Sequence, residues 1–229
     1  MEDDAGMDRK LFAQAMTKLL SGIAAVSAML FIPAGSFSYW KAWLLIGILF
    51  VPMFLAGIVM MVKSPELLRK RLNAREEQKE QKEVILLSGI MFLVSFVAAG
   101  LNYRFRWIEM PAWVSFAAAA VFLAGYVLFA EVLRENAYLS RTVEVQKDQK
   151  VIDTGLYGVV RHPMYMSTII LFLAMPAILG SLLGTVLMLL YIPIIAARID
   201  NEEKVLEEGL KGYREYKQKV RYKCIPGIW

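Results

Sequence analysis

The single histidine of the 229-residue chain, His162, lies in a short segment whose residue types can bind a charged ligand. The segment reads Arg161-His162-Pro163-Met164-Tyr165. Proline favours the first turn of a helix, because the N–H that it lacks would have no partner there, so we expect a helix to begin at Pro163. The free N–H groups and the positive dipole end of that helix can hold a carboxylate or a phosphate. His162 and Tyr165 are three residues apart and can face the same pocket.

A second interpretation assigns no ligand to this segment. Arg161 and His162 can extend to the lipid headgroups at a membrane surface, and Tyr165 can belong to the aromatic belt at the interface. Gly155 and Gly158 supply a flexible approach to the helix in either case. Spacing alone leaves both interpretations open.

A second group of charged residues lies about forty residues downstream. Arg198 and Glu202 are four residues apart, so on a helix they share a face and can pair, and Glu203 lies beside them. The alternative is an amphipathic helix that lies on the bilayer with its charges solvated. A charged cluster that directly continues a membrane helix opposite His162 adds weight to the ligand-binding interpretation.

The elements that must hold these residues are membrane helices. The chain is 58% hydrophobic, and five stretches of 20 to 35 residues contain no Asp, Glu, Lys, Arg or His. A helix needs roughly 20 apolar residues to cross a hydrocarbon core, so soluble globular, disordered and collagen-like classes are excluded. The uncharged stretches are Leu19–Trp40, Ala42–Val62, Val84–Tyr103, Met110–Ala130 and Pro163–Ala197.

The last of these stretches, with 35 residues, is too long for one straight crossing. As a helix it would extend about 52 Å at 1.5 Å per residue. Gly180-Ser181 near its middle is a breaker signal, so we expect two short helices, Pro163–Leu179 and Leu182–Ala197, joined as a hairpin. The predicted fold is an all-α polytopic membrane bundle of about six transmembrane helices, followed by a C-terminal amphipathic helix. Five helices with one steeply tilted span are the alternative.

The distribution of basic residues supports six spans. With six, 23 Lys and Arg residues fall on the side of the two termini and 3 on the other side, whereas five spans give a split of 15 to 11. Because cytoplasmic loops carry the excess of Lys and Arg, we expect both termini in the cytoplasm. The net charge of +5 therefore reflects topology and contact with anionic membrane lipids, and it indicates no nucleic-acid partner.

Two further features limit the possible sites. Ser64-Pro65-Glu66 in the loop 63–83 predicts a short interfacial helix, because serine caps a helix and proline suits its first position. Cys224 is the only cysteine and His162 the only histidine. An intramolecular disulfide and a Cys/His metal cage are thus excluded, and no metal is expected.

The C-terminal residues carry a family resemblance. Gly155-x-Tyr157-x-x-x-Arg161-His162-Pro163-x-Tyr165 precedes Arg198-x-x-x-Glu202-Glu203 by about forty residues, and Tyr213-x-x-Tyr216 and Pro226 follow. This pattern resembles the isoprenylcysteine carboxyl methyltransferase family, whose wider set includes phospholipid N-methyltransferases. The resemblance covers roughly Asn136–Trp229, about two fifths of the chain, while the first four spans match in general character alone.

The resemblance implies an integral membrane methyltransferase that uses S-adenosylmethionine. A lipidic acceptor, above all a prenylated cysteine carboxylate, would enter from the bilayer. Arg198 and Glu202 are the implied catalytic residues, with Arg198 placed to hold an acceptor carboxylate, and Asn136 and Arg141 would border the acceptor entrance. The implied cofactor residues are Gly155, Tyr157, Arg161, His162, Pro163, Tyr165, Glu202 and Glu203.

The resemblance also implies how the chain is divided. A four-span membrane region, residues 1–133, would contain the cytoplasmic loop 63–83. The catalytic region would follow as residues 134–229, with a cofactor segment 154–165, the helical hairpin 163–197 and a cytoplasmic tail 198–229.

The chemistry suits a site with few catalytic groups. A sulfonium methyl is already activated, so its transfer mainly requires that nucleophile and methyl are aligned and that water is excluded. Alignment can lower the barrier by on the order of 7–11 kcal/mol. A carboxylate acceptor needs no general base at pH 7, since its unperturbed pKa is near 4. An amine or thiol acceptor would need one, and Glu202, His162 and the tyrosines are the candidates.

Two other classes of function stay open. The ending Arg198-x-Asp200-x-Glu202, with Tyr216 and the segment Val220–Pro226, also resembles membrane sterol reductases, which bind NADPH and usually have more than six spans. A non-catalytic membrane scaffold is the other alternative. Transport is disfavoured, because the uncharged spans place no ionisable group at mid-membrane. The sequence does not specify the acceptor, the membrane, the oligomeric state or the separate roles of the two glutamates.

Overall fold

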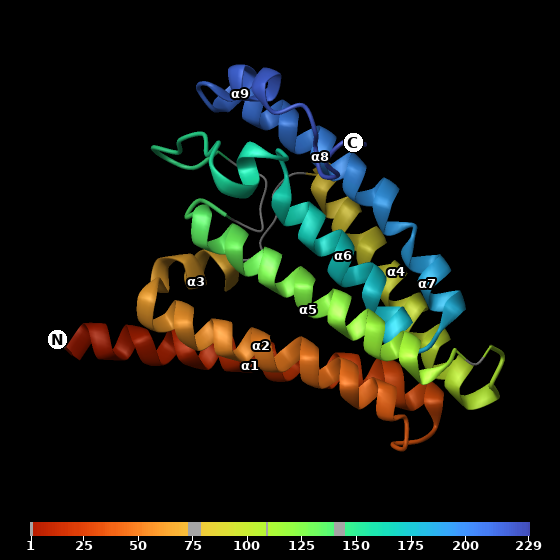
Figure 1. Cartoon of the computed structure of the whole chain (residues 1–229). Coiled ribbons are helices and arrows are strands. Elements are labelled where there is room, and N and C mark those ends of the chain that lie inside the picture. Colours follow the sequence, from red (N-terminus) through yellow and green to blue (C-terminus); the bar gives the residue numbers. More distant parts are fainter. Residues whose placement is uncertain (1, 73–78, 109, 140–144) are drawn as a thin grey trace.

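The chain folds as a bundle of helices, in agreement with the predicted all-α class (Figure 1). The computed structural model describes all residues except 1, 73–78, 109 and 140–144. The described helices are α1 (Glu2–Ala34), α2 (Trp40–Lys63), α3 (Pro65–Leu72), α4 (Lys79–Phe105), α5 (Ala112–Glu135), the 3-10 turn η1 (Gly155–Gly158), α6 (Pro163–Ile178), α7 (Leu182–Met188), α8 (Tyr191–Gly209) and α9 (Tyr213–Lys219). α3 confirms the short helix predicted at Pro65, and α6 begins at Pro163 as expected.

Within the described part of the chain, five helical segments are long and apolar enough to cross a membrane. They are Arg9–Ala34, Trp40–Lys63, Lys82–Phe105, Ala112–Glu135 and Leu182–Gly209. The chain is thus a multi-pass integral membrane protein.

The predicted hairpin is present as α6 followed by α7 and α8. α6 has 16 residues, fewer than the roughly 20 that a lipid-exposed crossing needs. In place of the six predicted spans, the described residues therefore form five helices long enough to cross a membrane and one shorter apolar helix. Nine residues of α6 are buried, and it packs along α5. A helix that is surrounded by protein need not match the hydrocarbon thickness by itself.

The turn of this hairpin follows the prediction at Gly180-Ser181. Gly180 has a φ of +72°, which a residue without Cβ adopts readily. The Ser181 hydroxyl then accepts a hydrogen bond from the Gly184 backbone N–H at 3.0 Å and caps α7. The second arm consists of α7 and α8, and α8 continues past Ala197 to Gly209, as expected for charged residues that follow the membrane helix without a glycine or proline.

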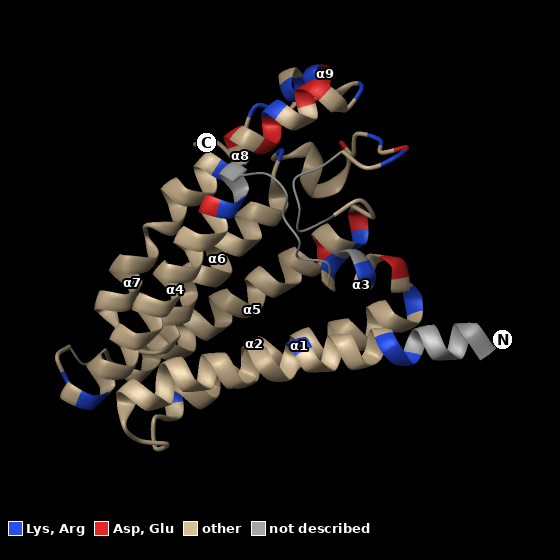
Figure 2. Ribbon diagram, turned by 180° about the vertical axis from the view of Figure 1, so that it is seen from behind, with Lys and Arg blue, Asp and Glu red and all other residues tan. Residues whose placement is uncertain are grey.

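The two ends of the bundle differ in charge (Figure 2). The connections 35–39, 106–111 and 179–181 lie at one end, and the charged residues near them are few. Most Lys, Arg, Asp and Glu side chains are at the other end, around α3, the connection after α5, and the region of α8 and α9. This is the clustering that the distribution of basic residues led us to expect.

Helices α1 and α4 approach each other closely at Gly100. A Cβ added at Gly100 would lie 2.7 Å from the Leu30 carbonyl oxygen and 3.2 Å from the Ala34 backbone nitrogen. Small residues at such points let membrane helices pack backbone against backbone.

Gly100→Ala should therefore destabilise the bundle, because the new methyl group forces α1 and α4 apart. We expect a loss of about 1–3 kcal/mol, measured as a lower unfolding temperature of the detergent-solubilised protein. Gly89→Ala on the same helix is the control, because a Cβ there meets nothing within 4 Å and should leave the unfolding temperature unchanged or slightly higher. Equal losses in the two variants would contradict the close approach.

Candidate active site

The Arg161–His162 segment is held in place by the C-terminal part of the chain. The Arg161 N–H donates to the Tyr222 carbonyl at 2.9 Å, and the His162 N–H donates to the Lys223 carbonyl at 2.8 Å. The Arg161 guanidinium also donates through Nη1 to the carbonyls of Val220 and Arg221, at 2.8 and 2.7 Å. Residues 220–223 thus form a strap across the segment that leads into α6.

The buried carboxylate of Glu203 is the centre of an ion-pair cluster. Its Oε1 accepts from Arg161 Nε at 2.7 Å and lies 3.2 Å from His162 Nε2, and its Oε2 lies 3.0 Å from Lys217 Nζ. Glu203 is 3% exposed. Glu207 and Glu203, both hydrogen-bonded to the ammonium of Lys217, raise the pKa of that group. One carboxylate therefore joins α8 to α9 and to the segment before α6.

The neighbouring Glu202 is placed differently. Its side chain is 23% exposed and accepts a hydrogen bond from the Tyr165 hydroxyl. Arg198 Nε donates to that same hydroxyl at 2.9 Å. His162 Nδ1 lies 3.9 Å from Glu202 Oε1. Since Nε2 faces the Glu203 carboxylate, Nε2 carries the ring proton, and Nδ1 is the nitrogen nearer to Glu202.

Tyr157 connects η1 to both neighbouring parts of the site. Its hydroxyl accepts a hydrogen bond from Asn136 Nδ2 at 2.8 Å, just after α5. Its carbonyl accepts one from the Tyr216 hydroxyl at 2.7 Å, from α9. Burial raises the pKa of Tyr157 and of Tyr216 well above the usual range for tyrosine, so both hydroxyls stay protonated and keep these bonds at neutral pH.

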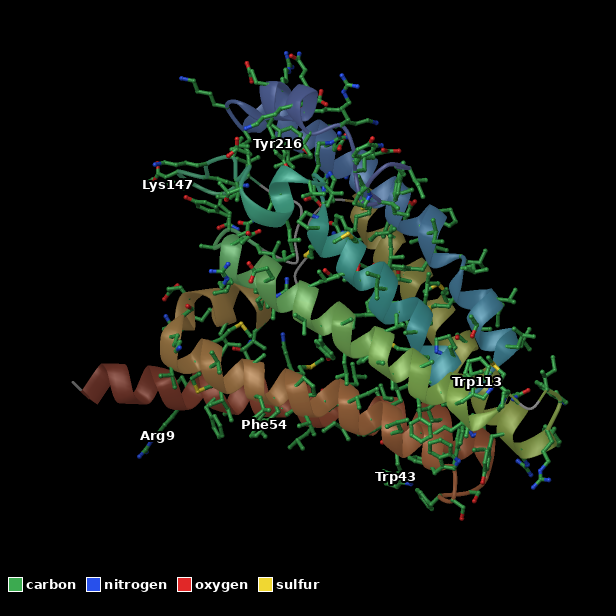
Figure 3. The ribbon with its side chains drawn as sticks, viewed as in Figure 1. Arg9, Trp43, Phe54, Trp113, Lys147 and Tyr216 are labelled. Carbon is green, nitrogen blue, oxygen red and sulfur yellow. The ribbon has the colours of Figure 1, made fainter. Side chains whose placement is uncertain are left out.

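These groups surround a hollow with about 840 Å³ of empty space, counting its open mouth. We call it the site hollow. Figure 3 shows Tyr216, and Lys147 on the connection before η1, at the same end of the molecule. The polar lining comes from the residues after α5, the connection before η1, the start of α6, and α8 and α9. It includes Asn136, Gln149, Lys150, Tyr157, Arg161, His162, Tyr165, Arg198, Glu202 and Tyr213.

The structure brings together most of the residues that the sequence proposed for the site. Those that line the site hollow are Asn136, Tyr157, Arg161, His162, Tyr165, Arg198 and Glu202. Gly155, Pro163 and Glu203 are not in the lining. Gly155 has a φ of +52°, and a Cβ there would overlap the Glu135 carboxylate. Arg141 lies outside the described residues.

Other lining residues were not among the proposed ones. Tyr213 is 3% exposed, and its hydroxyl has no hydrogen-bond partner among the described residues. Burial, with Glu203 and Glu202 nearby, raises the pKa of Tyr213, so the hydroxyl is a neutral donor. The Tyr213-x-x-Tyr216 spacing was the available signal, since it puts both rings on one face of a helix. Residues 149–152 offered no such signal, because they lie in an irregular connection.

One comparison with known proteins gave a family match that overlaps the residues of the site. The family description "Phospholipid methyltransferase" matches residues 113–212, from the start of α5 to the start of α9. This part of the chain is therefore similar to phospholipid methyltransferases. A comparison with curated proteins gave no match. The resemblance drawn from the sequence is thus confirmed over residues 113–212, and this match together with the five long apolar helices supports an integral membrane methyltransferase.

Cys224 lies beside the candidate site, where burial disfavours its thiolate form. It is fully buried, its Sγ contacts the His162 carbonyl at 3.6 Å, and burial raises the pKa of its thiol to about 12. At pH 7 the thiol is therefore protonated and covered.

Glu203→Gln should destabilise the protein strongly, because it leaves the buried Arg161 guanidinium without its charged partner. We expect a loss of about 3–5 kcal/mol in thermal or denaturant unfolding. Glu207→Gln is the matched control, since it removes the more exposed of the two carboxylates that pair with Lys217. This substitution should cost less than about 1 kcal/mol. Similar losses in both variants would show that Glu203 is not the centre of the cluster.

Cys224 should be inert in the folded protein because of its burial and raised pKa. We expect a maleimide reagent at pH 8 to leave native protein unlabelled and to label it fully after denaturation, as measured by intact-mass spectrometry. Rapid labelling of the native protein would contradict the burial of Cys224.

Proposed function

We propose that the chain is an S-adenosylmethionine-dependent methyltransferase that acts on a lipidic acceptor. One observation carries the proposal: a hollow lined mainly by the region that matches the methyltransferase family joins an open carboxylate, Glu202, to the hydroxyl of Tyr213. That hydroxyl is buried and has no hydrogen-bond partner among the described residues. The hollow lies at the mouth of the bundle, where both a polar cofactor and a membrane-dissolved acceptor have access.

The residues of the site hollow fit the polar groups of the cofactor. Buried polar groups are nearly always hydrogen-bonded, so the Tyr213 hydroxyl favours a ligand that supplies an acceptor. Glu202 is the one acidic residue in the described lining, and it offers a negative charge for an ammonium or hydrogen-bond acceptors for ribose hydroxyls. Lys150 and Arg161 in the same lining are candidates for the amino-acid carboxylate.

When bound, this cofactor supplies a methyl group already activated on a sulfonium. The chain then has to hold two reactants in line and keep water away. Tyr165 and His162, fixed by Glu202 and Glu203, orient one side of the hollow. The apolar part of the lining, Leu139, Met164, Val205, Leu206 and Leu210, limits the access of water.

Arg198 supports a carboxylate as the group that is methylated. Its guanidinium lines the hollow and is aimed by the hydrogen bond to Tyr165. A carboxylate held there is a nucleophile at pH 7 without a general base, since its unperturbed pKa is near 4. A prenylated cysteine carboxylate combines this group with a lipid chain that reaches the hollow from the bilayer.

The second candidate acceptor is the amine of a phospholipid headgroup, which the matched family description favours. Such an amine is protonated at pH 7 and must lose its proton before it attacks the methyl group. Glu202, with an exposed carboxylate edge beside His162 Nδ1, is then the candidate base.

Binding of S-adenosylhomocysteine, the demethylated product of the cofactor, tests the proposal. We expect saturable binding to the detergent-solubilised protein, measured by calorimetry, and at least a tenfold weaker binding for Glu202→Gln and for Tyr213→Phe, because each removes a polar partner. Glu207→Gln, which lies outside the lining, should bind as the wild type does.

The outcomes separate the alternatives. Binding of NADPH in place of S-adenosylhomocysteine would assign the chain to the reductases, and binding of neither by folded protein would leave a scaffold. The acceptor is identified by incubation of lipid extracts with a donor that carries an isotopically labelled methyl group. A labelled ester indicates a carboxylate acceptor, and a labelled headgroup amine indicates the phospholipid.

A further inference from the structure

The end of the bundle opposite the site hollow has a second cavity. It holds about 1110 Å³ of empty space, counting its mouth, and lies where the connections 35–39, 106–111 and 179–181 meet. We call it the far cavity. The residues used below to describe it are Tyr39, Trp40, Lys41, Asn102, Arg104 and Arg106, all of which line it.

All the basic residues at the end of the bundle opposite the site hollow line the far cavity. Of the 26 Lys and Arg residues in the chain, Lys41, Arg104 and Arg106 are the three that belong to this end. The sequence of the three connections and the adjoining helix ends contains one acidic residue, Glu109, which lies outside the described residues. The formal charge of these segments of the sequence is therefore +2. Cations are otherwise scarce at this end, so their convergence on a single cavity points to an anionic ligand.

Lys41 and Arg104 tie the cavity to the turns. Lys41 Nζ donates to the Met110 carbonyl at 2.9 Å, and it lies so close to Gly180 that a Cβ there would clash with it. A Cβ added at Gly35 would lie 3.7 Å from the Arg104 guanidinium. Two of these neighbours, Gly35 and Gly180, have positive φ values of +63° and +72°. The two cations thus lie against tight turns, whose glycines leave room for the cationic side chains.

The guanidinium of Arg104 is available for a ligand. Among the described residues it has no ion-pair partner, and it lies 5.5 Å from the centre of the Phe105 ring. Arginine pairs with phosphate through two parallel N–H···O bonds, which makes it the residue suited to a phosphodiester.

The surroundings of the cavity are those of a membrane interface. Trp43 and Trp113, labelled in Figure 3 at this end, are 52% and 70% exposed, and Phe37 and Trp107 beside the connections are also exposed. Exposed aromatic side chains at the ends of spans lie at the level of the lipid headgroups. A ligand of the far cavity is therefore most readily drawn from the lipids that surround the protein.

We propose that the far cavity binds the phosphodiester of a phospholipid headgroup and so fixes the three connections to one another. Arg104 holds the phosphate, Lys41 and Arg106 add positive charge, and the acyl chains lie along the exposed apolar faces of α2 and α5. This lipid is a bound structural component in the leaflet opposite the site hollow. The proposal does not depend on the methyltransferase reaction.

Titration of delipidated protein in a nonionic detergent tests this site, with the unfolding temperature and native mass spectrometry as readouts. We expect dioleoylphosphatidylglycerol to bind and to raise the unfolding temperature, because a ligand of the folded state stabilises it. Arg104→Gln should weaken this binding about tenfold, the cost of one charge-assisted hydrogen bond. Arg9→Gln, an exposed arginine at the other end, is the matched control and should bind as the wild type does.

Two further ligands test whether the far cavity binds a phosphate, and whether that phosphate must belong to a lipid. Dioleoylglycerol has the same acyl chains without phosphate, and glycerol 3-phosphate has the phosphate without chains; we expect neither to match the phospholipid. Equal stabilisation by dioleoylglycerol, or an unchanged affinity in Arg104→Gln, would overturn the phosphate site. Equal stabilisation by glycerol 3-phosphate would overturn its assignment to a lipid.

Discussion

The pairing of one buried carboxylate, Glu203, with two cations and the imidazole of His162 holds the candidate site together. A buried charge without partners costs several kcal/mol, so Glu203 is compatible with burial because Arg161, His162 and Lys217 all reach it. These partners come from the segment before α6 and from α9, which lie more than forty residues apart in the sequence. By pairing with these residues, Glu203 holds α8, α9 and the segment before α6 together around the hollow.

The two adjacent acids of α8 have separate physical roles. On a helix, neighbouring residues point about 100° apart, so when Glu203 faces the ion-pair cluster its neighbour Glu202 faces the hollow. The side chain of Glu203 is 4% exposed and that of Glu202 is 23% exposed. Glu203 positions His162 and the strap, while Glu202 is left to meet a ligand. The sequence placed both acids together in the cofactor site, because their spacing carries no information on which of them faces inward.

The sequence predicted the fold where local signals decide it. Pro163 and Gly180 are strong signals of this kind, and α6 begins at the one and ends before the other. The breaker at Gly180-Ser181 predicted a short helix here, but the length of an uncharged stretch does not show that α6 is surrounded by protein, so its burial was not predicted. The meeting of His162 with the tail glutamates was predicted from a family pattern. The strap and Lys217 were not, because backbone hydrogen bonds between distant segments leave no pattern in a sequence.

The different ligands proposed for the two cavities fit their positions in the bundle. The site hollow lies among the many charged residues at one end, and the far cavity lies among the few cations at the other. A lipid held in the far cavity has its headgroup across the bundle from Glu202, so it cannot be the acceptor of the same cycle. An acceptor must instead approach in the leaflet next to the hollow, with its reactive group near Arg198 and its chain in the bilayer. The same protein can thus keep one lipid as part of its structure while it modifies another.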